Sequence, residues 1–233
     1  MKSDQSQNGQ GKQEWFKSAR MTALSDGVFA IVLTLLVLEL KPDQANPAGL
    51  LADLRETLPK LEAWVVSFLS VGAIWAIHHN VIASVPRVDN RLNFLNLLLL
   101  MSVSLVPWTA DLMGTYTDPW AVVLFSGNLG LEGILMMLSW QHALGQASLA
   151  DRSLSAAQCR FVTLQLLRIP LVALLSISSA LLINRSLGLW AWTLMLPLGF
   201  LLRSRYGEGV GVSGEPLQRD QRRTVTRILK RKR

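Results

Sequence analysis

The chain contains six apolar segments, each close to the ~20 residues that a helix needs to cross about 30 Å of hydrocarbon. The first is the clearest, because no charged residue stands between Asp26 and Glu39. Only 17% of all residues are charged, against roughly a quarter in soluble domains. We therefore predict an all-α, multi-pass membrane protein with six transmembrane helices per subunit. The predicted spans are 20–40, 60–79, 91–110, 120–142, 160–183 and 187–203.

Polar and basic sequence flanks this apolar block. Residues 1–19 are predicted to form a polar cytoplasmic leader, 20–203 the transmembrane domain and 204–233 a basic cytoplasmic tail. The short turn at Asn184–Ser186 predicts that the last two spans form a tight helical hairpin. Six spans place both termini on one side, and most of the 23 Lys and Arg residues then fall on that side. We expect the protein in the cell membrane, and the positive-inside rule predicts that both termini are cytoplasmic.

The net charge of +7 does not indicate a nucleic-acid partner, because the basic residues flank apolar runs and form one tail. We interpret the tail as an orientation anchor, with a contact to anionic lipid as the alternative.

Several kinds of chemical site are not indicated. The single Cys159 excludes an internal disulfide and a cysteine-rich metal site. The adjacent His78 and His79 would point about 100° apart on a helix, which suits a shared metal poorly. Walker A, HExxH and GxSxG motifs are missing, and so is a TVGYG-type selectivity filter. We predict no enzymatic activity, no metal site and no cofactor.

The first span has two different faces when it is drawn as a helix. With a rotation of 100° per residue, Ile31, Thr34, Leu35 and Leu38 share one narrow stripe, and Asp26 falls on the opposite side. If the stripe faces a central axis, Asp26 faces other helices of the same subunit. The stripe would then control what passes, while the Ser-Asp pair would hold the helix in place.

A carboxylate within a span requires polar partners, because an isolated charge in low dielectric is costly. The end of the second span and the asparagine-rich start of the third lie at the same membrane level. We predict that Ser25 and Asp26 are hydrogen-bonded there, and a static brace without a gating role stays open. The predicted network comprises Arg20, Ser25, Asp26, Trp75, His78 and Asn93, and Asn90 and Asn96 are further candidates at the start of the third span.

Other residues within or near the spans are expected to be structural. Glu132 and Arg168 are expected to form an ion pair between the fourth and fifth helices. Glu39 and Asp43 are expected at the outer end of the first helix, as a cation-attracting ring or as a solvated helix end. The helices are expected to kink or end at Pro107, Pro170 and Pro197.

The first helix resembles a known signature. Residues 20–31, RMTALSDGVFAI, are similar to the RxxxFSDGVFAI motif of the bacterial TMEM175 family of potassium-permeable channels, with Leu24 in place of the usual Phe. The spacing of Trp75 and His78, the asparagines at the start of the third helix and the SLVPW segment at its end also resemble this family. The first three helices carry the resemblance.

The resemblance implies a homotetramer in which the first helix of each subunit lines a potassium-permeable pore. It implies that the constriction begins at Ile31 and continues over Thr34, Leu35 and Leu38, the stripe obtained above from helical geometry. Two alternatives stay open. One is a proton-coupled secondary transporter that uses Asp26, Glu132 and Arg168 as exchanging charges, and the other is a membrane scaffold without transport.

Overall fold

The computed structural model describes residues 4–40, 49–146, 149 and 154–206, with side chains from Ser18 onward. Every regular element in these ranges is a helix, as predicted. In chain order the elements are α1 (Asp4–Leu35), η1 (Leu36–Leu40), α2 (Leu50–Ala83), α3 (Asn90–Ser104), α4 (Val106–Thr115), α5 (Pro119–Gly145), α6 (Ala156–Leu182), α7 (Arg185–Trp190), η2 (Ala191–Leu194) and α8 (Met195–Tyr206).

Six helical stretches in the described residues are long and apolar enough to cross a membrane. Each overlaps one predicted span, so the prediction of six is confirmed. The 34 residues of α2 extend over ~50 Å, which exceeds the hydrocarbon thickness. The six stretches are Ser18–Leu40, Leu50–Ala83, Asn90–Thr115, Pro119–Gly145, Ala156–Leu182 and Arg185–Arg205.

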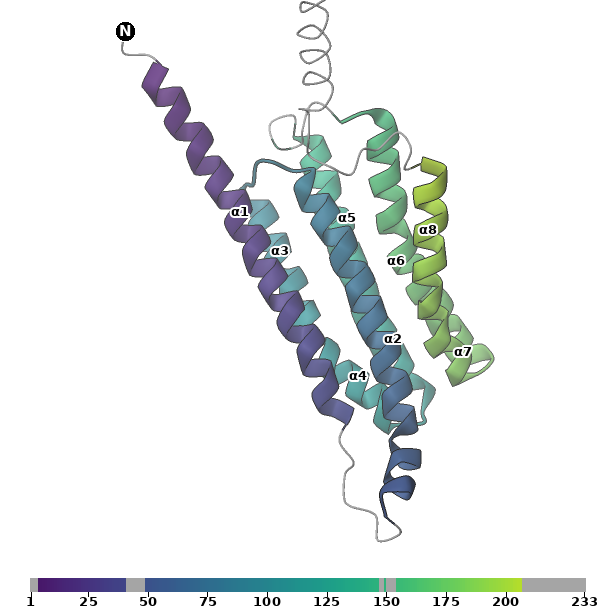
Figure 1. Cartoon of the computed structure of the whole chain (residues 1–233). Coiled ribbons are helices and arrows are strands. Elements are labelled where there is room, and N and C mark those ends of the chain that lie inside the picture. Colours follow the sequence, from purple (N-terminus) through teal and green to yellow (C-terminus); the bar gives the residue numbers. More distant parts are fainter. Residues whose placement is uncertain (1–3, 41–48, 147–148, 150–153, 207–233) are drawn as a thin grey trace, which may run out of the picture.

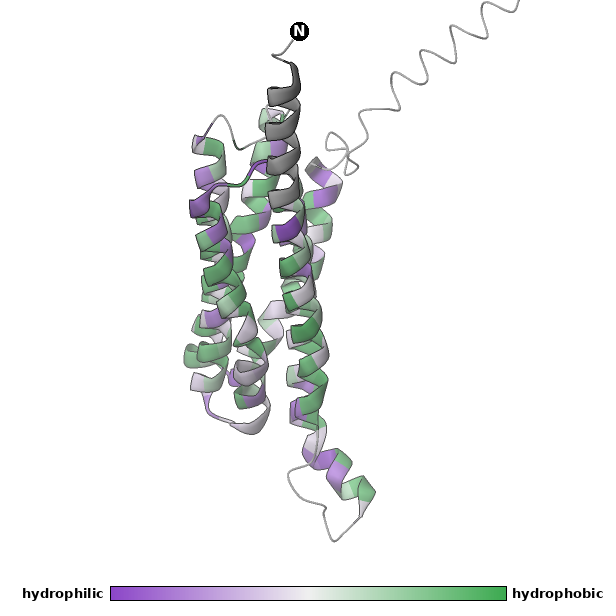
Figure 2. Ribbon diagram, turned by 90° about the vertical axis from the view of Figure 1, so that its left-hand side faces the viewer, coloured by the Kyte–Doolittle hydropathy of each residue, from purple (hydrophilic) through white to green (hydrophobic). Residues whose placement is uncertain are grey.

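The helices run up and down through a single bundle (Figure 1). α1 lies along one flank beside α2 and α3, whereas α6 and α8 lie at the opposite flank. The start of α1 and the end of α8 lie at the same end of the bundle, as an even number of spans requires. Figure 2 shows apolar residues along the middle of the helices and polar residues gathered toward their ends, which is the pattern of a membrane-spanning bundle.

Both ends of the first span differ from the sequence-based expectation. α1 begins at Asp4, so most residues of the segment that we expected as a polar leader belong to the same helix as the first span. At its other end the helix tightens into η1, where Glu39 is partly buried and lines a small pocket with Lys60 and Asp111. Asp43 and the basic tail from residue 207 onward lie outside the described residues.

The prolines affect the spans in different ways. Pro107 lies in the first turn of α4, and the third span is interrupted just before it, at Leu105, because proline cannot donate a backbone hydrogen bond. α6 continues past Pro170, so this residue does not end a helix as we had considered. Pro197 lies near the start of α8, where few N–H groups have helical partners anyway.

A chain of buried hydrogen bonds joins the last helices. The Trp192 indole N–H donates to Ser126 Oγ at 3.0 Å, the Ser126 and Ser176 hydroxyls lie 2.7 Å apart, and Ser176 Oγ donates to the Gly188 carbonyl at 2.6 Å. These groups come from η2, α5, α6 and α7. All of them are buried, so no water can bond to these polar groups, and they satisfy one another instead. The predicted hairpin after α6 is confirmed.

Asp89 fixes the start of α3. Its carboxylate accepts the Leu92 N–H at 2.8 Å and lies 2.7 Å from His142 Nε2 near the end of α5. Burial raises the pKa of Asp89, but these hydrogen bonds and the nearby His142 together hold it below its ordinary value. The capped helix start is thereby attached to α5, which sets the depth of the α3 side chains in the bundle.

Gly188 provides a test of the hairpin. A Cβ at this position would lie 2.6 Å from Ala180 Cβ and 2.7 Å from the Ser176 carbonyl oxygen, whereas a Cβ at Gly127 of α5 would meet nothing within 4 Å. We expect Gly188→Ala to destabilise the protein by about 1–3 kcal/mol through overpacking. Thermal unfolding of the detergent-solubilised protein measures this effect. Gly127→Ala is the control, and equal melting of the two variants would contradict the close packing.

Candidate functional site

α1 packs against the bundle with one face. Its most buried side chains recur every three or four residues, which places them on one side of the helix. Their exposed fractions are 2% or less, so this face is closed to lipid and water. These residues are Ser25, Phe29, Val32 and Leu36, the last in η1.

The opposite face of the first span is apolar and uncovered. Ile31 and Leu38 are each 59% exposed, Leu35 is 40% exposed and Thr34 is also exposed. The structure therefore separates the predicted stripe from the side that holds Ser25. Of the six spans in the described residues, the first has the smallest buried share, 22% of its most apolar window. A continuous apolar surface of this kind requires either lipid or another protein surface as its cover.

The stripe continues through a change of helix type. α1 ends at Leu35 and Leu38 lies in η1, so the rotation of 100° per residue no longer applies between them. A 3₁₀ helix has three residues per turn, and Leu38 is exposed like Leu35, which lies three residues before it. The Thr34 hydroxyl donates to the Ile31 carbonyl at 2.7 Å, so its hydrogen is used within the helix.

A buried hydrogen-bond network attaches α1 to α2 and α3. Asn96 Nδ2 donates to Ser25 Oγ at 3.1 Å, and Asn96 Oδ1 lies 3.0 Å from His78 Nε2. The Ser25 hydroxyl also lies 2.9 Å from the Met21 carbonyl and 3.3 Å from Asn96 Oδ1. Asn96 therefore serves as donor and acceptor between two other helices, and it does so with an exposed fraction of only 6%.

The hydrogen bond to Asn96 determines which ring nitrogen of His78 carries a proton. Because Asn96 Oδ1 is an acceptor, His78 must carry its proton on Nε2. The other ring nitrogen, Nδ1, is buried without a hydrogen-bond partner in the described structure. The imidazole also packs against Phe29 of α1, with ring centroids 5.4 Å apart. His78 thus contacts α1 directly through the Phe29 ring, and Asn96 links it to Ser25.

Asp26 makes a separate attachment at the edge of this face. Its carboxylate accepts the Trp75 indole N–H of α2 at 2.9 Å. Asp26 is only partly buried, and Trp75 is 38% exposed. Hydrogen bonds therefore connect Ser25 to α3 and Asp26 to α2, so the two consecutive residues bind different helices and resist rotation of α1.

Two members of the predicted network do not take part. Arg20 is exposed and Asn93 is partly buried, and neither side chain is hydrogen-bonded to another described residue. Asn96 replaces Asn93, because it lies one turn deeper on the face that also buries Leu92 and Leu99. That apolar periodicity was available in the sequence and would have selected Asn96.

The expected ion pair between Glu132 and Arg168 is not present. Gly133 packs against Ile169, so the two charged residues lie at about the same depth. Arg168 instead reaches across to Gly199 of α8. Both carboxyl oxygens of Glu132 are buried without a hydrogen-bond partner in the described residues. The prediction failed because depth alone does not determine which neighbouring helix a side chain faces.

No group of three or more His, Cys, Asp or Glu side chains suitable for a metal ion occurs among the residues that the structure describes.

Comparison with known proteins gives consistent matches. Residues 20–107 match the family described as "Endosomal/lysosomal potassium channel TMEM175". A protein named as a potassium channel from Streptomyces collinus is 38% identical over 150 residues, covering 62% of this chain and 73% of the relative. Another from Chamaesiphon minutus is 37% identical over 149 residues, covering 61% and 71%.

A solved structure is also similar. The crystal structure of a lysosomal potassium-selective channel TMEM175 homolog from Chamaesiphon minutus superimposes with a TM-score of 0.70 and 28% sequence identity. The match covers 80% of this chain and 98% of that chain, so it includes nearly the whole fold of the homolog.

The finding that Asn96 belongs to the network, and that Asn93 does not, can be tested directly. Asn96→Leu leaves His78 Nε2 without its partner, and a buried unsatisfied group costs about 1–3 kcal/mol. It also removes the contact of α3 with Ser25, whose hydroxyl keeps only the Met21 carbonyl. We expect a clear loss of thermal stability in detergent. Asn93→Leu is the matched control, because it makes the same chemical change one turn away and should leave the melting temperature nearly unchanged. The reverse order of effects would contradict the network.

Proposed function

The chain belongs to the TMEM175 family, and we propose that it is a potassium channel whose pore is lined by α1 from each subunit of a homotetramer. The observation that carries this proposal is the exposed apolar stripe of Ile31, Thr34, Leu35 and Leu38. A single α1 cannot surround an axis, so a pore wall made of this helix requires several copies of the chain.

The attachment of α1 supports the assignment of the stripe to a pore. A helix that only contacts lipid can rotate at little cost, because lipid tails accept any apolar face. Here Ser25 and Asp26 bind α3 and α2 through buried or partly buried groups, so the azimuth of α1 is fixed. Such fixation is needed where the residues on the opposite face, beginning with Ile31, must meet their symmetry mates in register.

The proposed constriction works by excluding water. Four Ile31 side chains around an axis would form an apolar ring, and a narrow apolar ring blocks ions because it dewets. Leu35 and Leu38 extend this apolar lining by further turns. A rotation of α1 that widens the ring would admit a hydrated or partly dehydrated K⁺ ion. The permeant ion is the only non-protein component that this function needs.

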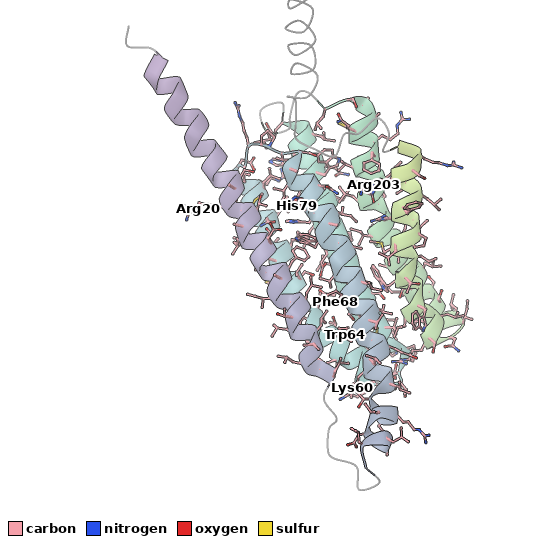
Figure 3. The ribbon with its side chains drawn as sticks, in the orientation of Figure 1. Arg20, Lys60, Trp64, Phe68, His79 and Arg203 are labelled. Carbon is pink, nitrogen blue, oxygen red and sulfur yellow. The ribbon has the colours of Figure 1, made fainter. Side chains whose placement is uncertain are left out.

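We assign both termini to the cytoplasm. The start of α1 and the end of α8 lie at one end of the bundle, where Figure 3 shows Arg20 and Arg203, while Lys60 lies toward the other end. Arg91 at the start of α3 and Arg160 in the first turns of α6 belong to the same end as Arg20. This charge asymmetry supports an orientation in the cell membrane with that end inside.

Potassium flux tests the proposed activity. The purified full-length protein, reconstituted in liposomes with a K⁺ gradient, is expected to pass a large flux that needs no coupled substrate. A proton-coupled transporter, which could use the unpaired Glu132, would show slow, saturable flux that depends on a proton gradient. A scaffold would pass nothing. Either of these two results would contradict the channel.

Ile31 is the most specific test of the constriction. In Ile31→Asn liposomes we expect a larger resting flux and a K⁺ over Na⁺ preference reduced toward one, because an amide ring holds water where the isoleucine ring excludes it. The control is Leu131→Asn, which places the same amide on an exposed position of α5. Unchanged flux and selectivity in Ile31→Asn would remove this residue from the constriction.

A further inference from the structure

A pocket of about 510 Å³ lies between α2, α6 and α8, away from the stripe of α1. Its polar lining is basic: Arg168 and Arg203 contribute guanidinium groups, and His79 and Asn80 line the α2 side. No Asp or Glu is among the lining residues. Figure 3 shows His79 and Arg203 toward the same end of the bundle as Arg20. The pocket therefore lies at the membrane level that we assign to the cytoplasmic side.

Arg168 is a buried cation without a partner. It is 9% exposed, and its Nε and Nη1 atoms lack hydrogen bonds to the described residues. The buried Oε1 of Gln165, which also lines the pocket, is likewise without a partner. An unpaired charge within a membrane span is costly, so Arg168 is expected to have an anionic partner that does not belong to the described residues.

Gly199 leaves room for the Arg168 side chain in this position. Nη1 of Arg168 lies so close to the α8 backbone at Gly199 that a Cβ there would collide with it. The guanidinium therefore depends on a residue without a side chain. Arg203 follows four residues later in α8, ~6 Å nearer the helix end. Arg168 of α6, whose guanidinium lies at Gly199, and Arg203 of α8 thus line the same pocket at different depths.

The rest of the pocket is apolar. Phe161 of α6 and Leu196 and Phe200 of α8 line it, together with small α2 residues such as Ala76. A free inorganic anion would gain nothing from these walls. A phospholipid would gain from both parts, because its phosphate can accept two N–H bonds from an arginine fork while its chains pack on apolar surface.

We propose that this pocket binds an anionic phospholipid of the cytoplasmic leaflet, with the phosphate held between Arg168 and Arg203 and the acyl chains along α8. None of the residues that line the site belongs to the α1 stripe. Lipid binding goes beyond the proposed channel function, and it can be measured whether or not the protein conducts ions.

Native mass spectrometry of the full-length protein in detergent tests the site. Phosphatidylglycerol, phosphatidylcholine and inorganic phosphate are added in separate titrations. We expect phosphatidylglycerol to bind at one site per subunit, and to bind about tenfold or more weakly in Arg168→Gln and in Arg203→Gln, because each variant loses charge-assisted hydrogen bonds. Arg205→Gln is the matched control for Arg203→Gln: it also removes an exposed charge from the last turn of α8, but Arg205 does not line the pocket.

A second variant separates geometry from charge. Gly199→Ala keeps every charge but displaces the Arg168 guanidinium, so it should also weaken phosphatidylglycerol binding. Arg205→Gln should bind phosphatidylglycerol as tightly as the unmodified protein. Arg203 is exposed, so Arg203→Gln does not disturb the bundle interior. Equal weakening by Arg205→Gln would indicate diffuse surface attraction and overturn the site. The site would also be overturned if phosphatidylcholine or inorganic phosphate bound as tightly as phosphatidylglycerol. Phosphatidylglycerol binding that is the same in all variants would overturn it too, and this result is expected if a second subunit fills the pocket.

Discussion

The rotation of α1 about its own axis is the constraint on which the rest of the structure depends. Within a bilayer there is no water to satisfy a polar group, so the buried amide of Asn96 requires polar partners on other helices. Ser25 of α1 and His78 of α2 are those partners. Once this contact is made, every other side chain of α1 has a determined direction, and the stripe that begins at Ile31 must point away from the subunit.

The two halves of the bundle are held by different kinds of contact. α1, α2 and α3 meet through amide, imidazole and indole groups near one end of the bundle. α5, α6 and α7 meet through small residues, where Gly130 lies close to Ala173 and Gly188 to Ala180, and through the hydroxyl chain of Ser126 and Ser176. Close approach of helices through small residues is a common means of packing in membranes, where the hydrophobic effect does not drive helices together.

Much of this structure follows from the sequence because two patterns in it are strong. Span length and lack of charge predicted the six helices, and the 100° rotation separated the stripe from Asp26. Details that depend on side-chain direction between helices did not follow. Asn93 and Asn96 are one turn apart, and only the position of α3 against α1 selects Asn96. Arg168 faces α8 and not Glu132, because a long side chain on α6 can extend toward either of two neighbouring helices. The change to η1 depends on the end of the span and has no clear sequence signal.

The orientation of Ile31 toward a shared axis is tested most directly by cross-linking between subunits. In a Cys159→Ser background, which removes the single native cysteine, the Ile31→Cys variant is oxidised in intact membranes. If four copies of this position surround a narrow pore, neighbouring thiols lie close enough for disulfides, whose Cα atoms are typically about 4.4–6.8 Å apart. The expected result is covalently linked subunit pairs. The contradicting result is that the subunits stay monomeric and that a fluorophore attached to the introduced thiol is quenched by a spin label dissolved in the lipid phase. Position 31 would then face lipid, and α1 would not line a pore.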